Sequence, residues 1–357
     1  METMTNIKTK KTTDSQLNKI DWNSLEFGKN VSDHMFTCQY KDGDWQQASI
    51  IPFQNLSLSP FTLALHYGQS IFEGMKAFRM EDGRVNIFRL EKHHDRLNRS
   101  LQRMCMPTVP FELFSSALEE LVNLDKEWIP KAEGTALYLR PLIFASEAKF
   151  GVKVADEYQF LILTAPVPAL YQKPIRVKVE RKYIRAAKGG TGYAKCAGNY
   201  GGVFLPTQIA KNEGFDAVIW TDASKHEYLE ESGVMNLMFV IDGKLITPAL
   251  SDSILDGVTR DSLLQIARDM DIEVEERSVS IIELINAFEY KTITEVFGAG
   301  TAAVVAPISE ISIDNTLYKI ASYEGDLIMR RLKSALEDIR LGRTLDVHGW
   351  NHVLNRS

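Results

Sequence analysis

One lysine of this 357-residue chain stands in a segment of unusual composition. The segment reads Gly189-Gly-Thr-Gly-Tyr-Ala-Lys195-Cys-Ala-Gly-Asn-Tyr200-Gly-Gly202, so six glycines flank Lys195. Glycine lets the backbone approach other groups closely and adopt positive φ angles. A lysine held in a dry pocket has a lowered pKa and becomes a nucleophile toward aldehydes. A solvated surface lysine is the alternative reading, but the segment carries too little charge for an ordinary solvated turn.

Two further segments offer a carboxylate and backbone N–H groups that can bind an anion. Glu231 and Asn236 stand in Glu230-Glu-Ser-Gly-Val-Met-Asn236, and Gly257-Val-Thr259 opens a predicted helix that runs through Met270. Thr259 can cap that helix, whose N–H groups and dipole favour a phosphate. Gly298-Ala-Gly-Thr-Ala302 can form another anion-binding nest of N–H groups. Taken alone, each has an ordinary structural reading, as an exposed carboxylate or a strand-to-helix turn.

Patterns of apolar residues predict the elements that must position these groups. Helical spacing predicts helices, whereas alternation and short apolar runs predict strands. An Asp-Gly pair between two strand-like runs predicts a hairpin, as at Asp82-Gly83 and Asp242-Gly243. The predicted helices are Leu90–Met104, Phe111–Leu124 and Thr259–Met270; the predicted strands are Met75–Met80, Arg84–Phe88, Thr135–Phe144, Tyr158–Ala165, Ile175–Val179, Asp216–Trp220, Leu237–Thr247 (a hairpin) and Ile272–Val279.

A proline-marked segment, Pro166 to Pro174, divides the chain. We expect a flexible N-terminal tail over residues 1–20, a small N-terminal domain over 21–167, an interdomain loop over 168–176 and a large domain over 177–357. Both domains mix strands and helices, so the predicted fold class is α/β (α+β) with mixed sheets.

Composition excludes several classes of function. The net charge of −6 gives no electrostatic reason to expect nucleic-acid binding. The three cysteines show no CxxC or Cys/His spacing, so we expect free thiols, no metal site and a reducing compartment. No apolar run approaches the roughly 20 residues that span a bilayer, and the polar N-terminus is no secretory signal. A cytoplasmic enzyme fits these observations.

The three chemical segments, in their order, resemble the class IV aminotransferases, which are pyridoxal-phosphate (PLP) enzymes of fold type IV. The class signature matches Glu231, Gly233, Asn236 and Thr247, and then Leu255, Gly257, Val258 and Arg260. Met238 departs from it, because an aromatic residue is usual there. Within the class the chain is similar to branched-chain aminotransferases through motifs that run from about Asp21 to Gly342: Leu65-His-Tyr67-Gly-Gln-Ser-Ile-Phe72-Glu-Gly-Met-Lys-Ala-Phe78, His94-Asp-Arg96-Leu97, Tyr138-Leu-Arg140-Pro141, Gly198-Asn-Tyr200 and Gly298-Ala-Gly-Thr-Ala302.

The resemblance implies a two-domain fold type IV enzyme, with PLP between the smaller N-terminal domain and the larger, PLP-binding C-terminal domain. Lys195 would be the Schiff-base lysine and move the proton, and Glu231 would keep the pyridine nitrogen protonated, which makes the ring an electron sink. Tyr200 would hydrogen-bond the ring hydroxyl. The phosphate would be held by Arg96, by the N–H groups of Val258 and Thr259, and by Thr301.

The resemblance also implies a substrate site and a homodimer. Tyr67, Phe72 and Tyr138 would wall an apolar pocket, and Arg140 would bind the second carboxylate of glutamate. The backbone of Gly300, Thr301 and Ala302 would bind the α-carboxylate. Tyr171 is only weakly assigned to the pocket, because the aromatic residue is offset by one position. Ala303 and Ala306 stand where some animal relatives carry a redox-active CxxC.

The predicted activity is reversible amino transfer between L-leucine, L-isoleucine or L-valine and 2-oxoglutarate. Two alternatives belong to the same class, namely D-amino-acid aminotransferase and aminodeoxychorismate lyase, and the motifs at Tyr67 and at Tyr138-Leu-Arg140 argue against both. A third alternative is a non-catalytic protein that binds PLP or pyrophosphate. Purified transaminase should be yellow and should bleach toward the pyridoxamine form with L-leucine, D-alanine would select the D-amino-acid aminotransferase, and a colourless protein would favour the non-catalytic alternative.

Overall fold

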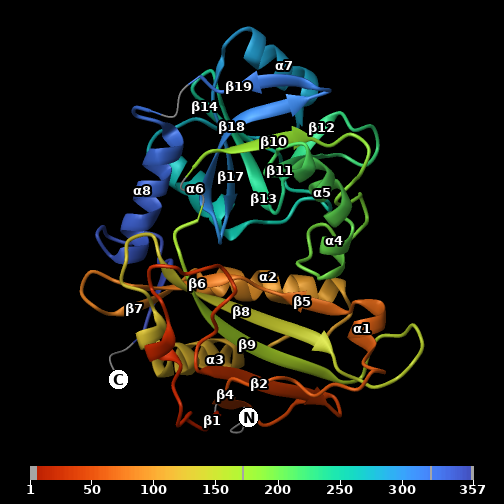
Figure 1. The fold of residues 1–357 in the computed structure, drawn as a ribbon, viewed down its shortest axis with the longest axis vertical. Coiled ribbons are helices and arrows are strands. Elements are labelled where there is room, and N and C mark those ends of the chain that lie inside the picture. The colour runs from red at the N-terminus through yellow and green to blue at the C-terminus, as the bar shows by residue number, and fades with distance from the viewer. Residues whose placement is uncertain (1–5, 171–172, 322–323, 355–357) are drawn as a thin grey trace. The chain divides into compact units, whose positions relative to one another are not determined.

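The computed structural model describes residues 6–170, 173–321 and 324–354 (Figure 1). The chain folds into two compact units, each with its own sheet. Unit 1 comprises residues 1–169, 194–198 and 338–357, and unit 2 comprises residues 170–193 and 199–337. The short segment that carries Lys195 therefore packs with unit 1, although its chain neighbours on both sides belong to unit 2.

Among the described residues, unit 1 contains a ten-stranded sheet with the order β1-β4-β2-β9-β8-β6-β7-β20, and β3 and β5 pair with β2 and β8. The pairs are antiparallel except for β1 with β4. Strand β1 lies in the expected N-terminal tail, so that part of the tail is held in the sheet. The bounds are β1 (Lys8–Thr9), β2 (His34–Lys41), β3 (Asp44–Trp45), β4 (Ser49–Pro52), β5 (Ser70–Phe72), β6 (Met75–Arg79), β7 (Val85–Phe88), β8 (Ala136–Ala145), β9 (Tyr158–Val167) and β20 (Asn351–Val353).

Two amphipathic helices, α2 (Leu90–Arg103) and α3 (Phe111–Leu124), pack their apolar faces into the core of unit 1. Leu97 and Leu101 of α2 join Phe114 of α3 and Phe36 of β2 in one buried cluster. Each such side chain contributes about 1.5–3 kcal/mol through burial. Figure 1 shows α2 beside β5 and α3 beside β2. The other helices of this unit are α1 (Leu63–Tyr67) and two 3₁₀ turns, Leu17–Lys19 and Lys126–Trp128.

Unit 2 is built around a second sheet that, over the ranges described, has ten strands in the order β15-β14-β13-β17-β18-β10-β11-β12-β16, with β19 on β18. Strand β12 also pairs with β13, so the sheet closes on itself. The strands are β10 (Ile175–Val179), β11 (Ala217–Thr221), β12 (Tyr228–Ser232), β13 (Met235–Ile241), β14 (Lys244–Thr247), β15 (Val274–Glu276), β16 (Val279–Ser280), β17 (Ile293–Gly300), β18 (Val304–Ile313) and β19 (Thr316–Lys319).

Parallel and antiparallel pairs coexist in the sheet of unit 2. Strand β10 runs parallel to both β11 and β18, whereas β13 runs antiparallel to β14 and β17. The predicted α/β fold with mixed sheets is thus confirmed. The helices are α4 (Gly198–Gly201), α5 (Phe204–Asn212), α6 (Val258–Asp269), α7 (Ile281–Glu289) and α8 (Ile328–Leu341), of which α4 and α8 cross the division between the units.

One predicted helix cap is wrong. Helix α6 begins at Val258 with Gly257 as its N-cap, and no side chain caps it. Thr259 is the second residue of the helix and is buried. Every helix in the described part of the chain is too short or too polar to cross a membrane.

Candidate active site

Lys195 is fixed in unit 1 through its backbone. Its carbonyl accepts the N–H of Phe72 at 3.1 Å, and its own N–H donates to the Ser100 hydroxyl at 3.0 Å. Cys196 forms a β-bridge with Ile71. Two of the glycines that precede the lysine have local reasons of their own: Gly189 has a positive φ of 75°, and a Cβ atom at Gly192 would stand 2.6 Å from the Cα of Ser253. The Lys195 side chain carries its amine to 4.8 Å from the centre of the Phe72 ring.

A buried group of charges stands next to this lysine. Glu73 is fully buried, and its two carboxylate oxygens accept the Nε–H and an Nη2–H of Arg96, both at 2.7 Å. His93 Nδ1 lies 3.0 Å from the same carboxylate. Burial opposes the charge of Glu73, but Arg96 outweighs it and holds the pKa of that carboxyl well below its usual range. The two-point fork fixes the plane of the Arg96 guanidinium.

Two basic side chains approach the ring of Phe72. The Arg140 guanidinium stacks 4.7 Å from the Phe72 ring centre, and Lys195 approaches the same ring. Arg140 also donates to the Tyr138 hydroxyl at 3.1 Å. A Cβ atom at Gly74 would stand only 2.0 Å from that hydroxyl, so this position requires glycine for space. Arg140 therefore contacts both of the other predicted pocket residues, Phe72 and Tyr138.

The surroundings of Lys195 lower the pKa of its side-chain amine. Burial among these groups lowers the pKa of the Lys195 amine, and the positive charges of Arg96 and Arg140 lower it further. Glu73 acts in the opposite direction but does not cancel these effects. A larger fraction of the amine is consequently neutral at a given pH, and the neutral amine is the form that attacks carbonyls and accepts protons.

The predicted pocket residues outside this cluster differ in their positions. Tyr67 ends α1 and is 42% exposed, and its hydroxyl accepts the N–H of Gly151 at 3.1 Å. Tyr171 lies outside the described residues.

In unit 2, Glu231 is buried on β12 and both of its oxygens face donors. The N–H of Leu255 donates to Oε1 at 2.7 Å, and Arg185 Nε lies 3.0 Å from Oε2. The Arg185 side chain is only 9% exposed and also donates to the carbonyl of Ser253. A buried carboxylate keeps its charge only beside a cation or several N–H donors, and Glu231 has both kinds of neighbour.

The remaining predicted residues of unit 2 lie at the start of a helix and in a tight hairpin. Val258 and Thr259 open α6 and are buried. Gly300 ends β17 and pairs with Val304 of β18, so Thr301 and Ala302 form the turn of that hairpin. Tyr200 lies in α4, in the glycine-rich segment that follows Lys195.

Sequence reasoning missed the roles of Glu73, His93 and Arg185. Glu73 belongs to the motif that runs from Leu65 to Phe78, but no neighbouring residue indicates that it pairs with an arginine on α2. Arg185 belongs to no motif. A cue for each exists only after folding, as a buried charge within reach of a predicted site residue.

Comparisons with known proteins agree on one family. The model of the family "Amino-transferase class IV" matches residues 70–311. Branched-chain-amino-acid transaminase 1 of Bacillus subtilis is 43% identical over 93% of this chain and 95% of its own length. The crystal structure of the Escherichia coli branched-chain amino acid aminotransferase matches with a TM-score of 0.74 at 26% identity, covering 91% of this chain and 99% of that one. The T.th. branched-chain amino acid aminotransferase complexed with N-(5'-phosphopyridoxyl)-L-glutamate matches with a TM-score of 0.71 at 27% identity, covering 89% and 98%.

Proposed function

We propose that this chain, which belongs to the class IV aminotransferase family, transfers an amino group reversibly between L-leucine, L-isoleucine or L-valine and 2-oxoglutarate. It is a transferase of fold type IV. The single observation that carries the proposal is the contact of the Lys195 amine with Phe72, beside Arg96, Tyr138 and Arg140. A nucleophilic lysine, an anion-binding arginine and an aromatic wall with a second arginine are the groups that this transfer requires.

The donor set fits PLP. Lys195 would carry the aldehyde carbon, and Glu231 would pair with the ring nitrogen, helped by Tyr200 at the ring hydroxyl. Arg96, the first N–H groups of α6 at Val258 and Thr259, and Thr301 would hold the phosphate. The N–H groups at the start of a helix can bind an anion, and no side chain caps those of α6. When bound, PLP supplies an electron-accepting protonated ring.

Lys195 moves the proton in this reaction. Because its pKa is lowered, the neutral Nζ can accept the proton from the substrate α-carbon and return it to the acceptor side. Glu73 keeps Arg96 oriented. Ser100 holds the backbone of Lys195, so the side chain can move while its backbone stays in place. The backbone of Gly300, Thr301 and Ala302 would bind the α-carboxylate.

Phe72 and Tyr138, with Tyr67, would form the wall for the aliphatic side chain, and Arg140 would pair with the distal carboxylate of glutamate. The buried Nε of Arg140 has no hydrogen-bond partner within the described ranges, which supports a ligand carboxylate as its partner. The complex of the T.th. enzyme with a phosphopyridoxyl glutamate gives independent support for glutamate.

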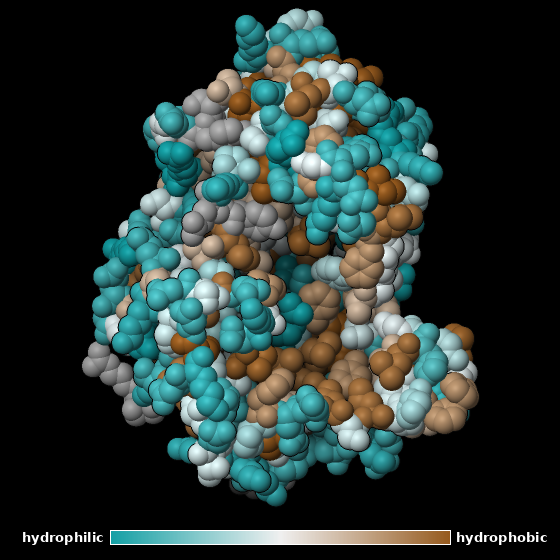
Figure 2. Space-filling view, viewed as in Figure 1, coloured by the Kyte–Doolittle hydropathy of each residue, from teal (hydrophilic) through white to brown (hydrophobic). Residues whose placement is uncertain are grey.

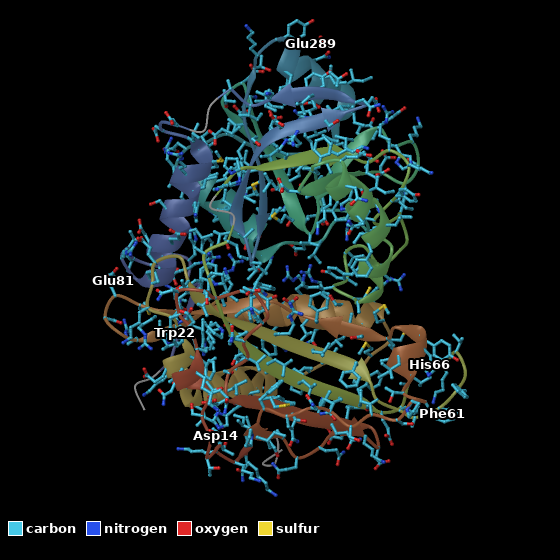
Figure 3. The ribbon with its side chains drawn as sticks, in the orientation of Figure 1. Asp14, Trp22, Phe61, His66, Glu81 and Glu289 are labelled. Carbon is cyan, nitrogen blue, oxygen red and sulfur yellow. The ribbon has the colours of Figure 1, made fainter. Side chains whose placement is uncertain are left out.

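A homodimer in the cytoplasm completes the proposal. Unit 1 exposes apolar side chains on α1 and a neighbouring loop, here called the α1 patch: Phe61, Leu65, Tyr67, Phe150 and Val152. Phe61 and Phe150 lie 4.3 Å apart between ring centres. Figure 3 labels Phe61 and His66 at this edge, and Figure 2 shows apolar residues gathered there in the same orientation. Such a patch supports burial by a second copy of the chain. Three free cysteines are compatible with a reducing compartment.

The activity is tested by the identity of the amino donor. Purified protein should be yellow, and L-leucine, L-isoleucine and L-valine should each bleach the colour. D-alanine should leave the colour unchanged. Bleaching by D-alanine alone would replace the proposal with a D-amino-acid transaminase, and a colourless protein that PLP does not tint would exclude PLP chemistry.

Lys195→Ala should abolish turnover, since the amine that moves the proton is then gone. Lys188, an exposed lysine of the same loop, provides the control, and Lys188→Ala should keep parental activity. The measurement is the rate of 2-oxoglutarate-dependent loss of L-leucine. A Lys195→Ala protein with near-parental rate would remove Lys195 from the mechanism.

Glu231→Gln should lower the catalytic rate by a larger factor than it raises the dissociation constant of PLP. The amide cannot stabilise a protonated ring nitrogen, whereas the other contacts to the cofactor remain. The two quantities are measured by steady-state kinetics and by titration of the apoprotein. An unchanged rate would place Glu231 outside the site.

A further inference from the structure

Two residues of the class signature reach the same residue of the chain, Leu255. Glu231 of β12 and Asn236 of β13 are direct partners across the two strands. The N–H of Leu255 donates to Glu231 Oε1 at 2.7 Å, and the carbonyl of Leu255 accepts from Asn236 Nδ2 at 2.9 Å. All of these contacts lie within unit 2, and both side chains are buried. Leu255 is thus held at both of its backbone polar groups.

The amide oxygen of Asn236 explains why residue 257 is a glycine. A Cβ atom at Gly257 would stand 1.9 Å from Asn236 Oδ1, which is an impossible approach. The backbone of Gly257 has φ −72° and ψ 123°, a conformation open to any residue. Glycine is therefore required here for space and not for a left-handed turn. Gly257 is also the N-cap of α6, a helix of 12 residues.

Arg260 and Thr247, two more signature residues, fasten the same region. The Arg260 guanidinium donates to the carbonyl of Pro248 at 3.0 Å, and it pairs with Glu276 at 2.9 Å. The Thr247 hydroxyl donates to the carbonyl of Leu237 at 2.7 Å, which ties β14 to β13. None of these side chains belongs to the predicted set of cofactor ligands.

We propose that Asn236 is a positioning residue that sets the first turn of α6. By holding Leu255 and packing against Gly257, it fixes where the N–H groups of Val258 and Thr259 point. This role rests on the proposed function, in which these N–H groups hold the phosphate of PLP. Because Glu231 holds the same Leu255, one backbone residue fixes the separation between the carboxylate for the ring nitrogen and the N–H groups for the phosphate.

A comparison of two ligands, one with a phosphate and one without, distinguishes a positioning role of Asn236 from a general effect on stability. Asn236→Ala removes the donor to Leu255 without changing any charge, so the first turn of α6 loses its anchor. The dissociation constant of PLP from the full-length apoprotein should rise about tenfold or more, because an anion site tolerates little displacement of its donors. Pyridoxal has the same ring and aldehyde but no phosphate, and its dissociation constant should change less than about twofold.

Asn86→Ala is the matched control. Asn86 is a buried asparagine of unit 1 that donates to the carbonyl of Arg340 at 2.9 Å. Its loss should reduce the melting temperature without altering the ratio of the two dissociation constants.

A second variant tests the close approach itself. Gly257→Ala alone should weaken PLP binding strongly, because the new methyl group displaces Asn236 or the helix start. In Asn236→Ala/Gly257→Ala the obstructing oxygen is gone, so the PLP dissociation constant should return toward that of Asn236→Ala. Additive losses in the double variant would overturn the steric part of the inference.

The outcomes distinguish this inference from the proposed function. If the parent binds PLP and pyridoxal equally well, the phosphate site of the proposed function is wrong. If the parent prefers PLP and Asn236→Ala keeps the full preference, the proposed function stands and the positioning role of Asn236 is overturned. Equal weakening of both probes would make Asn236 a residue of general stability, which also overturns the inference.

Discussion

In the proposed function, Arg140 is the residue on which recognition of two unlike substrates depends. Leucine needs an apolar wall, and burial of its side chain is worth about 1.5–3 kcal/mol. Glutamate in the same pocket would leave a carboxylate unpaired, at a cost of several kcal/mol. Arg140→Met should therefore slow the glutamate half-reaction about tenfold to a hundredfold, since a charged hydrogen bond contributes about 1.5–3 kcal/mol. The leucine half-reaction should fall less than about threefold.

Single-turnover kinetics of each half-reaction measures this difference. Arg79→Met, a substitution at the end of β6 in the same sheet, should leave both rates close to those of the parent. Equal losses in Arg140→Met would make Arg140 a support for Phe72 and Tyr138, with no part in substrate choice.

The cysteines should react in order of their exposure. Cys105 is exposed, whereas Cys38 and Cys196 are buried. Burial also raises the pKa of the Cys38 thiol to about 12, so its reactive thiolate is scarce. An aromatic disulfide reagent should therefore titrate about one thiol rapidly in the native protein. That fast reaction should vanish in Cys105→Ser, and its loss in Cys196→Ser would show that the thiol beside Lys195 is accessible.

At the residue scale, the sequence predicts groups that belong to local motifs and misses their partners. Lys195 is recognisable from its glycines, and Phe72, Tyr138 and Arg140 from their motifs, and these four lie together in unit 1. Glu73 pairs with Arg96 and Arg185 pairs with Glu231, and each partner is distant in the chain. A single sequence does not indicate which distant residues the fold brings together. The ligand roles themselves stay predictions.

At the scale of the element, Asp222 determines the turn between β11 and β12, the strand that carries Glu231. Its carboxylate accepts the N–H groups of Ser224, Lys225, Glu227 and Tyr228, as well as the Ser224 hydroxyl. Partial burial opposes the charge, but these hydrogen bonds outweigh it and hold the pKa of Asp222 below its usual range. Asp222→Asn replaces one acceptor oxygen by a donor and should destabilise the protein by about 1–3 kcal/mol.

The pH dependence of the melting temperature tests whether the charged carboxylate of Asp222 is the source of this stabilisation. A depressed pKa means that the stabilisation is complete above the unfolded-state pKa of about 3.9 and is lost as the pH falls toward the folded value. Melting temperatures of parent and Asp222→Asn should therefore differ most at pH 7 and converge below about pH 4. A constant difference across that range would assign the effect to packing and not to charge.

Most elements follow from local patterns, because periodicity reports which face is buried. The predicted spans Phe111–Leu124 and Ile175–Val179 coincide with α3 and β10, and the hairpin turned at Asp242-Gly243 joins β13 to β14. The cap of α6 was missed because the rule looks for a side chain that accepts hydrogen bonds. At Gly257 the deciding factor is the approach of Asn236 from another strand, which no local pattern records.

At the scale of the whole molecule, the α1 patch predicts self-association. Phe150→Asp places a charge in the patch and should shift the protein toward monomer, because an unpaired buried carboxylate is costly in an apolar interface. Sedimentation velocity measures the shift. Tyr290→Asp alters an aromatic residue of unit 2 that is 76% exposed and lies outside the patch, and it should not change the assembly. A parent that sediments as a monomer at all concentrations would refute the dimer.

The assignment of segments to units is the least predictable property of this chain. Proline-rich composition indicates a division near residue 170, and unit 2 begins at Leu170. Nothing local indicates that residues 194–198 and 338–357 return to unit 1. Their membership depends on contacts such as the N–H of Phe72 with the carbonyl of Lys195, which form only when the chain folds back.

This return of the chain limits how the protein can be divided. The boundary between the units is crossed at 169/170, 193/194, 198/199 and 337/338. A protease that cuts once, at any of these places, leaves the units covalently joined through the other three. Neither unit can be produced as one contiguous fragment with its own part of the site, because the lysine of unit 1 is encoded within the stretch for unit 2. If the chain were divided near residue 170 and the two halves were expressed as separate genes, Lys195 would be part of the C-terminal fragment, apart from most of unit 1.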